Sequence, residues 1–246
     1  MLIALFADIH ANRQAFEACL AQARDLGAQR TVLLGDLVGY GADPGWVAST
    51  AMELADKGAL AVLGNHDSAI SNPREQMNVE AQIAIEWTCG ELGASQRRFL
   101  ANLPFRVNDD DRLYVHADAS DPARWIYVVS TAEASRSLAI DPAQITFCGH
   151  VHRPALYSMS PTAKMTAFTP VTGAPIPLLQ GRRWLAVLGS VGQPRDGNPA
   201  AAFAIFDTDR RELTYCRVPY DVEQAVAAIR RKGLPRWLAD RLLVGQ

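Results

Sequence analysis

Short apolar runs of strand length recur through the first hundred residues and alternate with longer stretches that have helical spacing. The apolar runs are Leu2–Ala7, Thr31–Leu34 and Leu60–Leu63. Between the second and third runs we expect a helix over Pro44–Lys57, because proline suits a helix start and Gly58 suits its end. This alternation is typical of βαβ units built around a buried sheet.

The pattern then changes from helical stretches to short β-like runs. Residues Val79–Leu103 predict one or two helices before the change, and a pair of helices, Asp221–Lys232 and Pro235–Leu243, closes the chain. No repeat or Gly/Ser/Pro-rich linker divides the sequence, so we expect an α/β fold in a single domain, residues 1–246, with two sheets inside and helices outside. The strands expected in the second half are Arg112–Val115, Ile145–Cys148, Ala155–Met159, Trp184–Leu188, Ala202–Phe206 and Leu213–Val218.

Composition narrows the class of protein without naming a function. The chain has 246 residues, 49% hydrophobic and 20% charged, with a formal net charge of −2. This balance excludes a disordered or collagen-like chain, and the mixed charges give no footprint for nucleic acid. No apolar run approaches the roughly 18 residues of a membrane span. The four cysteines form no C-x-x-C pair, which favours reduced thiols and a cytoplasmic protein.

Five polar clusters carry the candidate chemistry, and each follows an apolar run of strand length. All five histidines of the chain fall within these clusters. Because ligands collect beyond the carboxyl ends of strands in α/β sheets, we expect the clusters to converge on one crevice. The clusters are Asp8-Ile9-His10, Gly35-Asp36, Gly64-Asn65-His66-Asp67, His116 and Gly149-His150-Val151-His152.

Each cluster taken alone also has a structural interpretation. A polar pair after a strand is commonly a turn, and His150 and His152 two residues apart would share the solvent face of a strand. Such interpretations are independent of one another and do not explain why histidine is absent elsewhere in the chain. The joint pattern therefore favours one functional site.

The donor types indicate a metal site. Imidazole, carboxylate and amide groups without thiolate suit Mn²⁺, Fe, Zn²⁺ or Ni²⁺. Seven donors exceed what one four-coordinate ion takes, so two ions that share one carboxylate are the economical count. The candidate ligands are Asp8, His10, Asp36, Asn65, His116, His150 and His152.

These blocks resemble the calcineurin-like metallophosphoesterases, whose pattern is D-x-H, G-D-x-x-G, G-N-H-[DE], a lone His and G-H-x-H. Every ligand position of that pattern is present between residues 8 and 152. The segments Gly39–Pro44, Gly189–Gly197 and Gly233–Pro235 are similar to a bacterial branch of small stand-alone members. The resemblance implies a four-layer α/β/β/α sandwich of two mixed sheets flanked by helices.

The resemblance also implies roles for individual residues. Asp36 would bridge two metal ions and a hydroxide between them would attack phosphorus, while His66 would protonate the departing oxygen. The adjacent Asp67 would favour the protonated form of His66 or fix its tautomer. One ion would be held by Asp8, His10 and His152, and the other by Asn65, His116 and His150.

Weaker expectations concern substrate contacts and glycines. Asn12 either caps the first helix or reaches a bound phosphate, and Arg195 suits bidentate phosphate contact. Gly35, Gly64 and Gly149 are expected to let the backbone turn sharply, so that the next side chain points into the cleft.

We therefore expect a cytoplasmic, metal-dependent hydrolase of phosphate monoesters or diesters, with nucleotides and dinucleotides among its substrates. The alternatives are a protein Ser/Thr phosphatase and a non-catalytic scaffold that binds partner proteins. A protein Ser/Thr phosphatase would have an Asp-Arg-Gly triplet at this point, whereas Leu37-Val38-Gly39 follow Asp36 here. A non-catalytic scaffold would be expected to have lost ligand residues, and none is missing from this sequence. The loops Ser68–Asn78 and Lys164–Gln180, expected around the site, contain no motif that names a substrate, and the oligomeric state stays open.

Overall fold

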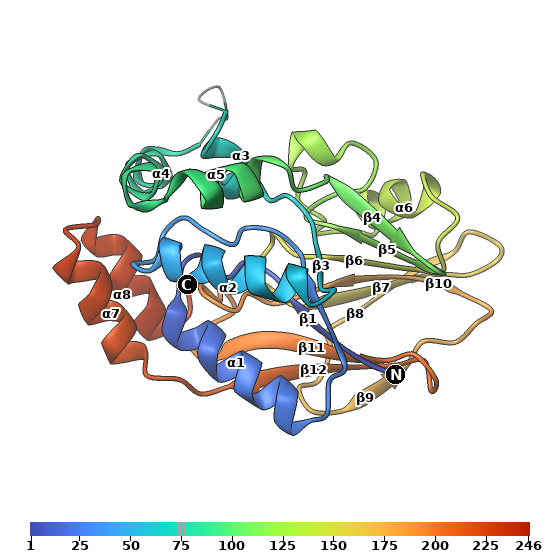
Figure 1. Ribbon diagram of the computed structural model, residues 1–246. Helices are drawn as coiled ribbons and strands as arrows, with labels where there is room; N and C mark the ends of the chain where they lie inside the picture. Colours follow the sequence, from blue (N-terminus) through green and yellow to red (C-terminus); the bar gives the residue numbers. More distant parts are fainter. Residues whose placement is uncertain (73–74, 76) are drawn as a thin grey trace.

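Two six-stranded sheets pack face to face in the computed structural model, which describes residues 1–72, 75 and 77–246 (Figure 1). In the first sheet the parallel strands β3, β2 and β1 adjoin three antiparallel strands, so the sheet is mixed. Its spatial order is β3 (Leu60–Ala61), β2 (Arg30–Leu33), β1 (Leu2–Phe6), β11 (Ala201–Asp207), β12 (Glu212–Val218) and β9 (Pro175–Pro177).

The second sheet is also mixed. Its central strands β5, β6 and β10 are parallel, and antiparallel strands pair on either side. Its spatial order is β4 (Arg106–Asp109), β5 (Arg112–Val115), β6 (Ile145–Cys148), β10 (Arg183–Val187), β7 (Ala155–Met159) and β8 (Met165–Phe168).

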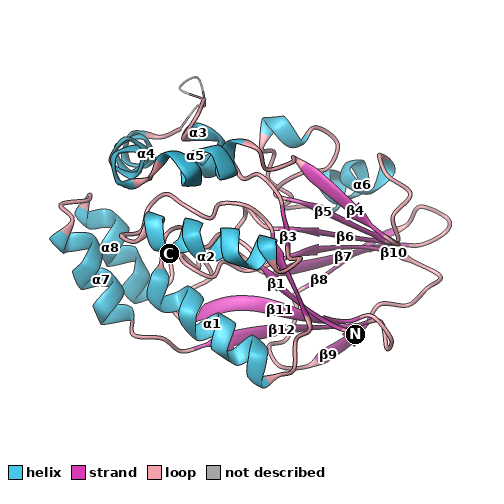
Figure 2. Ribbon diagram, in the orientation of Figure 1, coloured by secondary structure: helices cyan, strands magenta, loops and turns pink. Residues whose placement is uncertain are grey.

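Helices cover the outer faces of both sheets and extend past one end of the sandwich (Figure 2). The layers are therefore helix, sheet, sheet and helix, as the sequence predicted. The helices are α1 (Arg13–Asp25), α2 (Pro44–Asp56), α3 (Asn65–Ala69), α4 (Val79–Glu91), α5 (Ala94–Ala101), α6 (Thr131–Ala139), α7 (Val222–Arg231) and α8 (Arg236–Val244), with a 3₁₀ turn at Pro122–Arg124.

Alternation along β1 explains why the two sheets and the helices pack together. Ile3 and Leu5 lie in the core between the sheets, whereas Ala4 and Phe6 face the core under α1 and α2. All four are fully buried, as expected of a strand covered on both faces. Burial of each large apolar side chain contributes about 1.5–3 kcal/mol.

The strands that were predicted as continuous apolar runs are confirmed, and the ones that were missed lie at sheet edges. β5, β6 and β7 begin and end where the sequence predicted. Lys164–Gln180, expected as a loop around the site, instead contains the edge strands β8 and β9, and α3 and α6 were not predicted. Part of the other expected loop, residues 73, 74 and 76, lies outside the described residues.

The parallel strands decide where the functional side chains gather. β1, β2 and β3 are parallel in one sheet, and β5 and β6 are parallel in the other. Asp8, Asp36 and Asn65 follow the first three strands, and His116 and His150 follow the other two. The side chains after these strands therefore meet at one end of the sandwich.

Two further features bear on the sequence predictions. Every cysteine lies in the described part of the chain and is a free thiol, as predicted. Among the described residues no helix has the length and apolarity that crossing a bilayer requires.

Candidate metal centre

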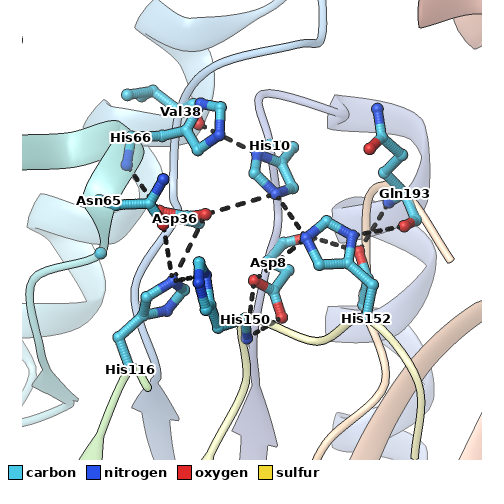
Figure 3. Close-up of polar contacts among 12 residues, drawn as sticks. Asp8, His10, Asp36, Val38, Asn65, His66, His116, His150, His152 and Gln193 are labelled. Atoms are coloured by element: carbon cyan, nitrogen blue, oxygen red, sulfur yellow. Dashed lines mark hydrogen bonds and ion pairs between the residues drawn. The ribbon is translucent and has the colours of Figure 1, made fainter. Parts of the chain in front are cut away.

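Two groups of buried side chains form the candidate metal centre, and they share Asp36 (Figure 3). Within each group, the atoms that can hold a metal lie within 4.8 Å of one another. Asn65 adds an amide oxygen beside the second group, 3.2 Å from His116 Nε2. The first group consists of Asp8, His10, Asp36 and His152, and the second of Asp36, His116 and His150.

In the first group the donor atoms face inward. His10 Nε2 and His152 Nε2 are 3.1 Å apart. Asp8 Oδ1 lies 3.4 Å from His152 Nε2, and Asp36 Oδ2 lies 3.6 Å from His10 Nε2. Asp8 is further fixed because both of its carboxylate oxygens accept the backbone N–H of His150, at 3.1 and 2.9 Å.

The second group has the same arrangement around His116. Its Nε2 lies 3.2 Å from His150 Nδ1 and 3.4 Å from Asp36 Oδ2. The other oxygen of Asp36, Oδ1, accepts the backbone N–H of His66 at 2.9 Å. Asp36 is thereby held between the two groups with one oxygen toward the imidazoles of both.

The outer nitrogen of each of the four imidazoles contacts a backbone carbonyl. A carbonyl only accepts, so the outer nitrogen carries a proton, and in the neutral form of each ring the inner nitrogen presents a lone pair to the centre. This fixes both the tautomer and the ring orientation that a metal ligand needs. The contacts are His10 Nδ1 to Val38 O at 3.3 Å, His116 Nδ1 to Leu34 O at 2.7 Å, His150 Nε2 to Trp125 O at 2.9 Å, and His152 Nδ1 to Gln193 O at 2.6 Å.

The backbone at the centre adopts conformations that side-chain-bearing residues rarely take. Among the described residues that are not glycine, those with left-handed φ include five of the candidate ligands. Such a conformation costs of order 1 kcal/mol or more and concentrates at functional sites. The five are Asp8 (φ 54°), His10 (φ 49°), Asp36 (φ 51°), His150 (φ 67°) and His152 (φ 60°).

The glycines beside these ligands serve two different purposes. Gly35 has φ +79°, so it provides the expected turn before Asp36. Gly64 has φ −100°, a conformation that any residue can adopt, so the backbone there does not require glycine. A Cβ on Gly64 would lie 2.1 Å from the backbone N of Asp36, and one on Gly149 would lie 2.7 Å from Asp8 Oδ2. At these two positions glycine is needed for space.

Burial dominates the electrostatics of the centre. It raises the pKa of Asp8 to about 7, and it lowers the pKa of His66 to about 4 and that of His150 to about 3. Burial also lowers the pKa values of His10 and His152 well below the ordinary value.

Asp36 and His116 depart from this trend because they stabilise each other's charge. Burial works to raise the pKa of Asp36, but the charges of His116 and His66 hold it well below its ordinary value. Although burial opposes it, the Asp36 carboxylate raises the pKa of His116 to about 9.

The Asp67 carboxylate contacts backbone, not the His66 ring. Its oxygens accept the N–H groups of Leu37 at 2.9 Å, Val38 at 3.2 Å and Gly64 at 3.2 Å. Asp67 thus ties the loop after β2, which carries Asp36, to the loop after β3, which carries Asn65. Its contacts are those of a residue that positions ligands.

Replacing Asp67 by Ala is expected to destabilise the fold strongly. Three backbone N–H groups would lose their buried acceptor, at about 1–3 kcal/mol each. At least about 3 kcal/mol in total lowers the Tm of a chain of this size by roughly 6–12 °C. Thermal unfolding of chelator-treated protein measures this without a contribution from metal. The exposed Asp25→Ala, at the end of α1, is the control, and an equal shift in both variants would contradict this role for Asp67.

The two candidate substrate-binding residues, Asn12 and Arg195, differ in how many hydrogen bonds their side chains form within the protein. Asn12 caps α1 by accepting the N–H of Ala15 at 3.1 Å, and its amide group donates to Gly192 O and Tyr220 Oη. The capping alternative for Asn12 is therefore confirmed. Arg195 is half-buried beside His152, whose carbonyl accepts the Arg195 backbone N–H at 3.2 Å.

Two aromatic residues also contribute to the centre, in ways that the sequence did not predict. Trp125 orients His150 through its backbone carbonyl, from a left-handed conformation (φ 52°). Its indole donates to Glu75 at 2.8 Å, which holds the turn in place. Tyr40 packs against His10 and His66 with ring centroids 4.6 and 4.3 Å apart. Every residue has a backbone carbonyl, so only the three-dimensional structure identifies the carbonyls that orient the imidazoles.

The whole chain is similar to known proteins. The sequence profile of the Calcineurin-like phosphoesterase superfamily domain matches residues 1–211. An uncharacterized protein of Methanocaldococcus jannaschii is 31% identical over 252 residues, which covers 100% of this chain and 98% of that protein. The crystal structure of a metallophosphoesterase from Sphaerobacter thermophilus has a TM-score of 0.88 at 33% identity, covering 100% of this chain and 99% of that one. A hypothetical protein from Pyrococcus horikoshii OT3 shares the fold, with a TM-score of 0.79 at 19% identity over 100% and 98% of the two chains.

Proposed function

Because the chain belongs to the calcineurin-like phosphoesterase superfamily, we propose that it is a metal-dependent hydrolase of phosphate monoesters or diesters with two divalent cations. The observation that carries this proposal is the sharing of Asp36 by two groups of inward-facing donors. A single carboxylate common to two adjacent donor sets suits a pair of cations and a phosphoryl group between them.

The residues of the centre fit divalent cations of intermediate softness. In their neutral forms the four imidazoles present a lone pair inward, and Asp8 and Asp36 supply the negative charge that offsets a cation. Nitrogen and oxygen donors without thiolate suit Mn, Fe, Zn or Ni. We assign Asp8, His10 and His152 to one ion, Asn65, His116 and His150 to the other, and Asp36 to both.

Bound divalent cations would lower the pKa of water and offset negative charge on phosphoryl oxygens. The protein's own contribution is to fix the donors and to supply a proton. In the hydrolysis, a bond forms from the water oxygen to phosphorus, the ester P–O bond breaks, and the leaving oxygen takes up a proton.

We propose His66 as the donor of that proton. Its ring lies edge-on to His10, with centroids 4.8 Å apart, and outside the two ligand groups. No described residue forms a hydrogen bond with its buried Nδ1, so the ring is not tied to a carbonyl as the other four imidazoles are. Burial lowers the pKa of this ring to about 4, so it serves as a general acid where the negative charge of a bound phosphoryl group raises that pKa again.

Removal of metal tests the proposed function directly. We expect chelator treatment to lower hydrolysis of bis(p-nitrophenyl) phosphate or p-nitrophenyl phosphate at least about 100-fold, because the cations supply several kcal/mol of transition-state stabilisation. Added Mn²⁺ is expected to restore the activity, with about two metal equivalents bound per chain. Elemental analysis and a colorimetric assay measure both quantities.

The same experiment separates the alternatives. Hydrolysis that resists the chelator would contradict metal catalysis. Protein that binds two equivalents of metal but hydrolyses no ester in a screen of monoesters, diesters and dinucleoside polyphosphates would instead favour the scaffold. A screen with Mn²⁺, Zn²⁺, Ni²⁺ and Mg²⁺ identifies the preferred ion.

A further inference from the structure

Two arginines from distant parts of the chain converge on one neutral oxygen at the edge of the metal centre. Arg195 Nη2 donates to Gln193 Oε1 at 2.9 Å, and Arg241 Nη1, from α8, donates to the same atom at 3.1 Å. Gln193 is also the residue whose backbone carbonyl orients His152 (Figure 3). Two like charges therefore meet beside the first group of metal donors.

Neither guanidinium is paired with an Asp or Glu carboxylate in the part of the chain that the structure describes, which contains every Asp and Glu. The acidic residues next to them in sequence pair with other arginines. Asp196 pairs with Arg217, and Asp240 pairs with Arg230 at 2.7 Å. Neither Arg195 nor Arg241 therefore forms an ion pair with an acidic side chain of the described residues.

Contacts on both sides tie this pair to the centre. The Arg195 guanidinium lies over the Tyr40 ring, 5.9 Å from its centroid, and Tyr40 packs against His10 and His66. Leu238 and Leu242 of α8 line a pocket together with His10, Tyr40 and Gln193. The helix that carries Arg241 therefore flanks the metal centre, although it lies beyond the residues 1–211 that match the family profile.

Arg241 is held in place by contacts that include no acidic side chain. Its guanidinium lies 4.2 Å from the ring centroid of Trp237, one turn earlier on α8, and its Nε donates to the main-chain oxygen of the last residue, Gln246. Burial, followed by repulsion from Arg195, lowers the pKa of Arg241 to about 10, so it stays protonated at neutral pH. The buried Nε of Arg195 has no partner among the described residues. Partly buried like charges of this kind favour binding of an anion.

We propose that Arg195 and Arg241 form a subsite for a second phosphoryl group, so that the preferred substrates carry phosphate groups in a chain, as nucleoside polyphosphates do. The proposal rests on the proposed function, which places the scissile phosphoryl group at the metal centre. A guanidinium binds phosphate oxygens through paired N–H donors, and two guanidiniums match the charge of a further phosphoryl group. A substrate with one phosphate reaches only one of the two positions.

The experiment compares two non-hydrolysable anions as inhibitors of bis(p-nitrophenyl) phosphate hydrolysis by the Mn²⁺-loaded protein at fixed free Mn²⁺. Methylphosphonate carries one phosphonate group and methylenediphosphonate carries two. In the wild type we expect the Ki of methylenediphosphonate to be at least about tenfold lower than the Ki of methylphosphonate. We expect Arg241→Gln to reduce the ratio of these two Ki values about tenfold, because charged hydrogen bonds are lost. Arg236→Gln, an exposed arginine of the same helix, is the control and should keep the wild-type ratio.

A wild-type protein without preference between the two anions, or an unchanged ratio in Arg241→Gln, would overturn the subsite. Arg241→Lys retains the charge but loses the paired donors, and an intermediate ratio in it supports the proposal even if Arg241→Gln folds poorly. Titration calorimetry of chelator-treated protein with methylenediphosphonate supplies a readout that does not depend on activity. Binding that requires Arg241 in a protein without esterase activity supports the subsite and contradicts only the proposed function.

Discussion

Turnover by Asp36→Asn is expected to fall at least about 10³-fold in kcat/KM, which corresponds to about 4 kcal/mol of transition-state stabilisation. Asp36 is the one side chain common to both donor groups, with Oδ2 3.4 Å from His116 Nε2 and 3.6 Å from His10 Nε2. An amide retains the shape and an oxygen but removes the charge that two cations would share. Steady-state kinetics with saturating Mn²⁺ and elemental analysis measure the two consequences.

The control for this variant concerns folding. Asn is nearly isosteric with Asp and can still accept the His66 N–H that Asp36 Oδ1 accepts at 2.9 Å. We therefore expect chelator-treated Asp36→Asn to unfold within a few degrees of the chelator-treated wild type. Full activity in a purified, folded Asp36→Asn protein would refute the assignment of this residue as the shared ligand.

Substitution of His66 by Gln is expected to lower kcat about 10²- to 10⁴-fold for an alkyl phosphate ester, the usual contribution of general acid catalysis. The loss should be much smaller for p-nitrophenyl phosphate, because nitrophenolate departs without a proton. Since His66 lies outside both donor groups, the bound metal per chain should not change. The dependence of kcat on leaving-group pKa, together with elemental analysis, checks both expectations.

This dependence separates a proton donor from a residue with a structural role. A residue that only supported the fold would slow both esters to the same extent. Equal losses for the alkyl and p-nitrophenyl esters, or a parallel loss of metal, would therefore exclude His66 as the general acid.

The sequence predicted the buried strands of the fold well and missed the exposed ones. β5, β6 and β7 were predicted to the residue because each is a compact apolar run between turn residues. β8 and β9 lie at sheet edges where half or more of the strand is exposed, and β9 begins and ends with proline, so neither has the pattern of a buried strand. The short helix α3, which begins at Asn65, has only 5 residues, fewer than the periodicity of a helix needs to show.

The sequence by itself determined the candidate donors: which imidazoles, carboxylates and amide follow which strands, and that their chemistry suits a metal. Local pattern suffices for this, because a strand end and the residue after it are neighbours along the chain. Only the tertiary structure decided how these donors are held and what surrounds them. The carbonyls that orient the imidazoles, the space that Gly64 leaves for Asp36, and the meeting of Arg195 with Arg241 all depend on segments that are brought together by packing. Such contacts leave no trace in the spacing of residues along the chain.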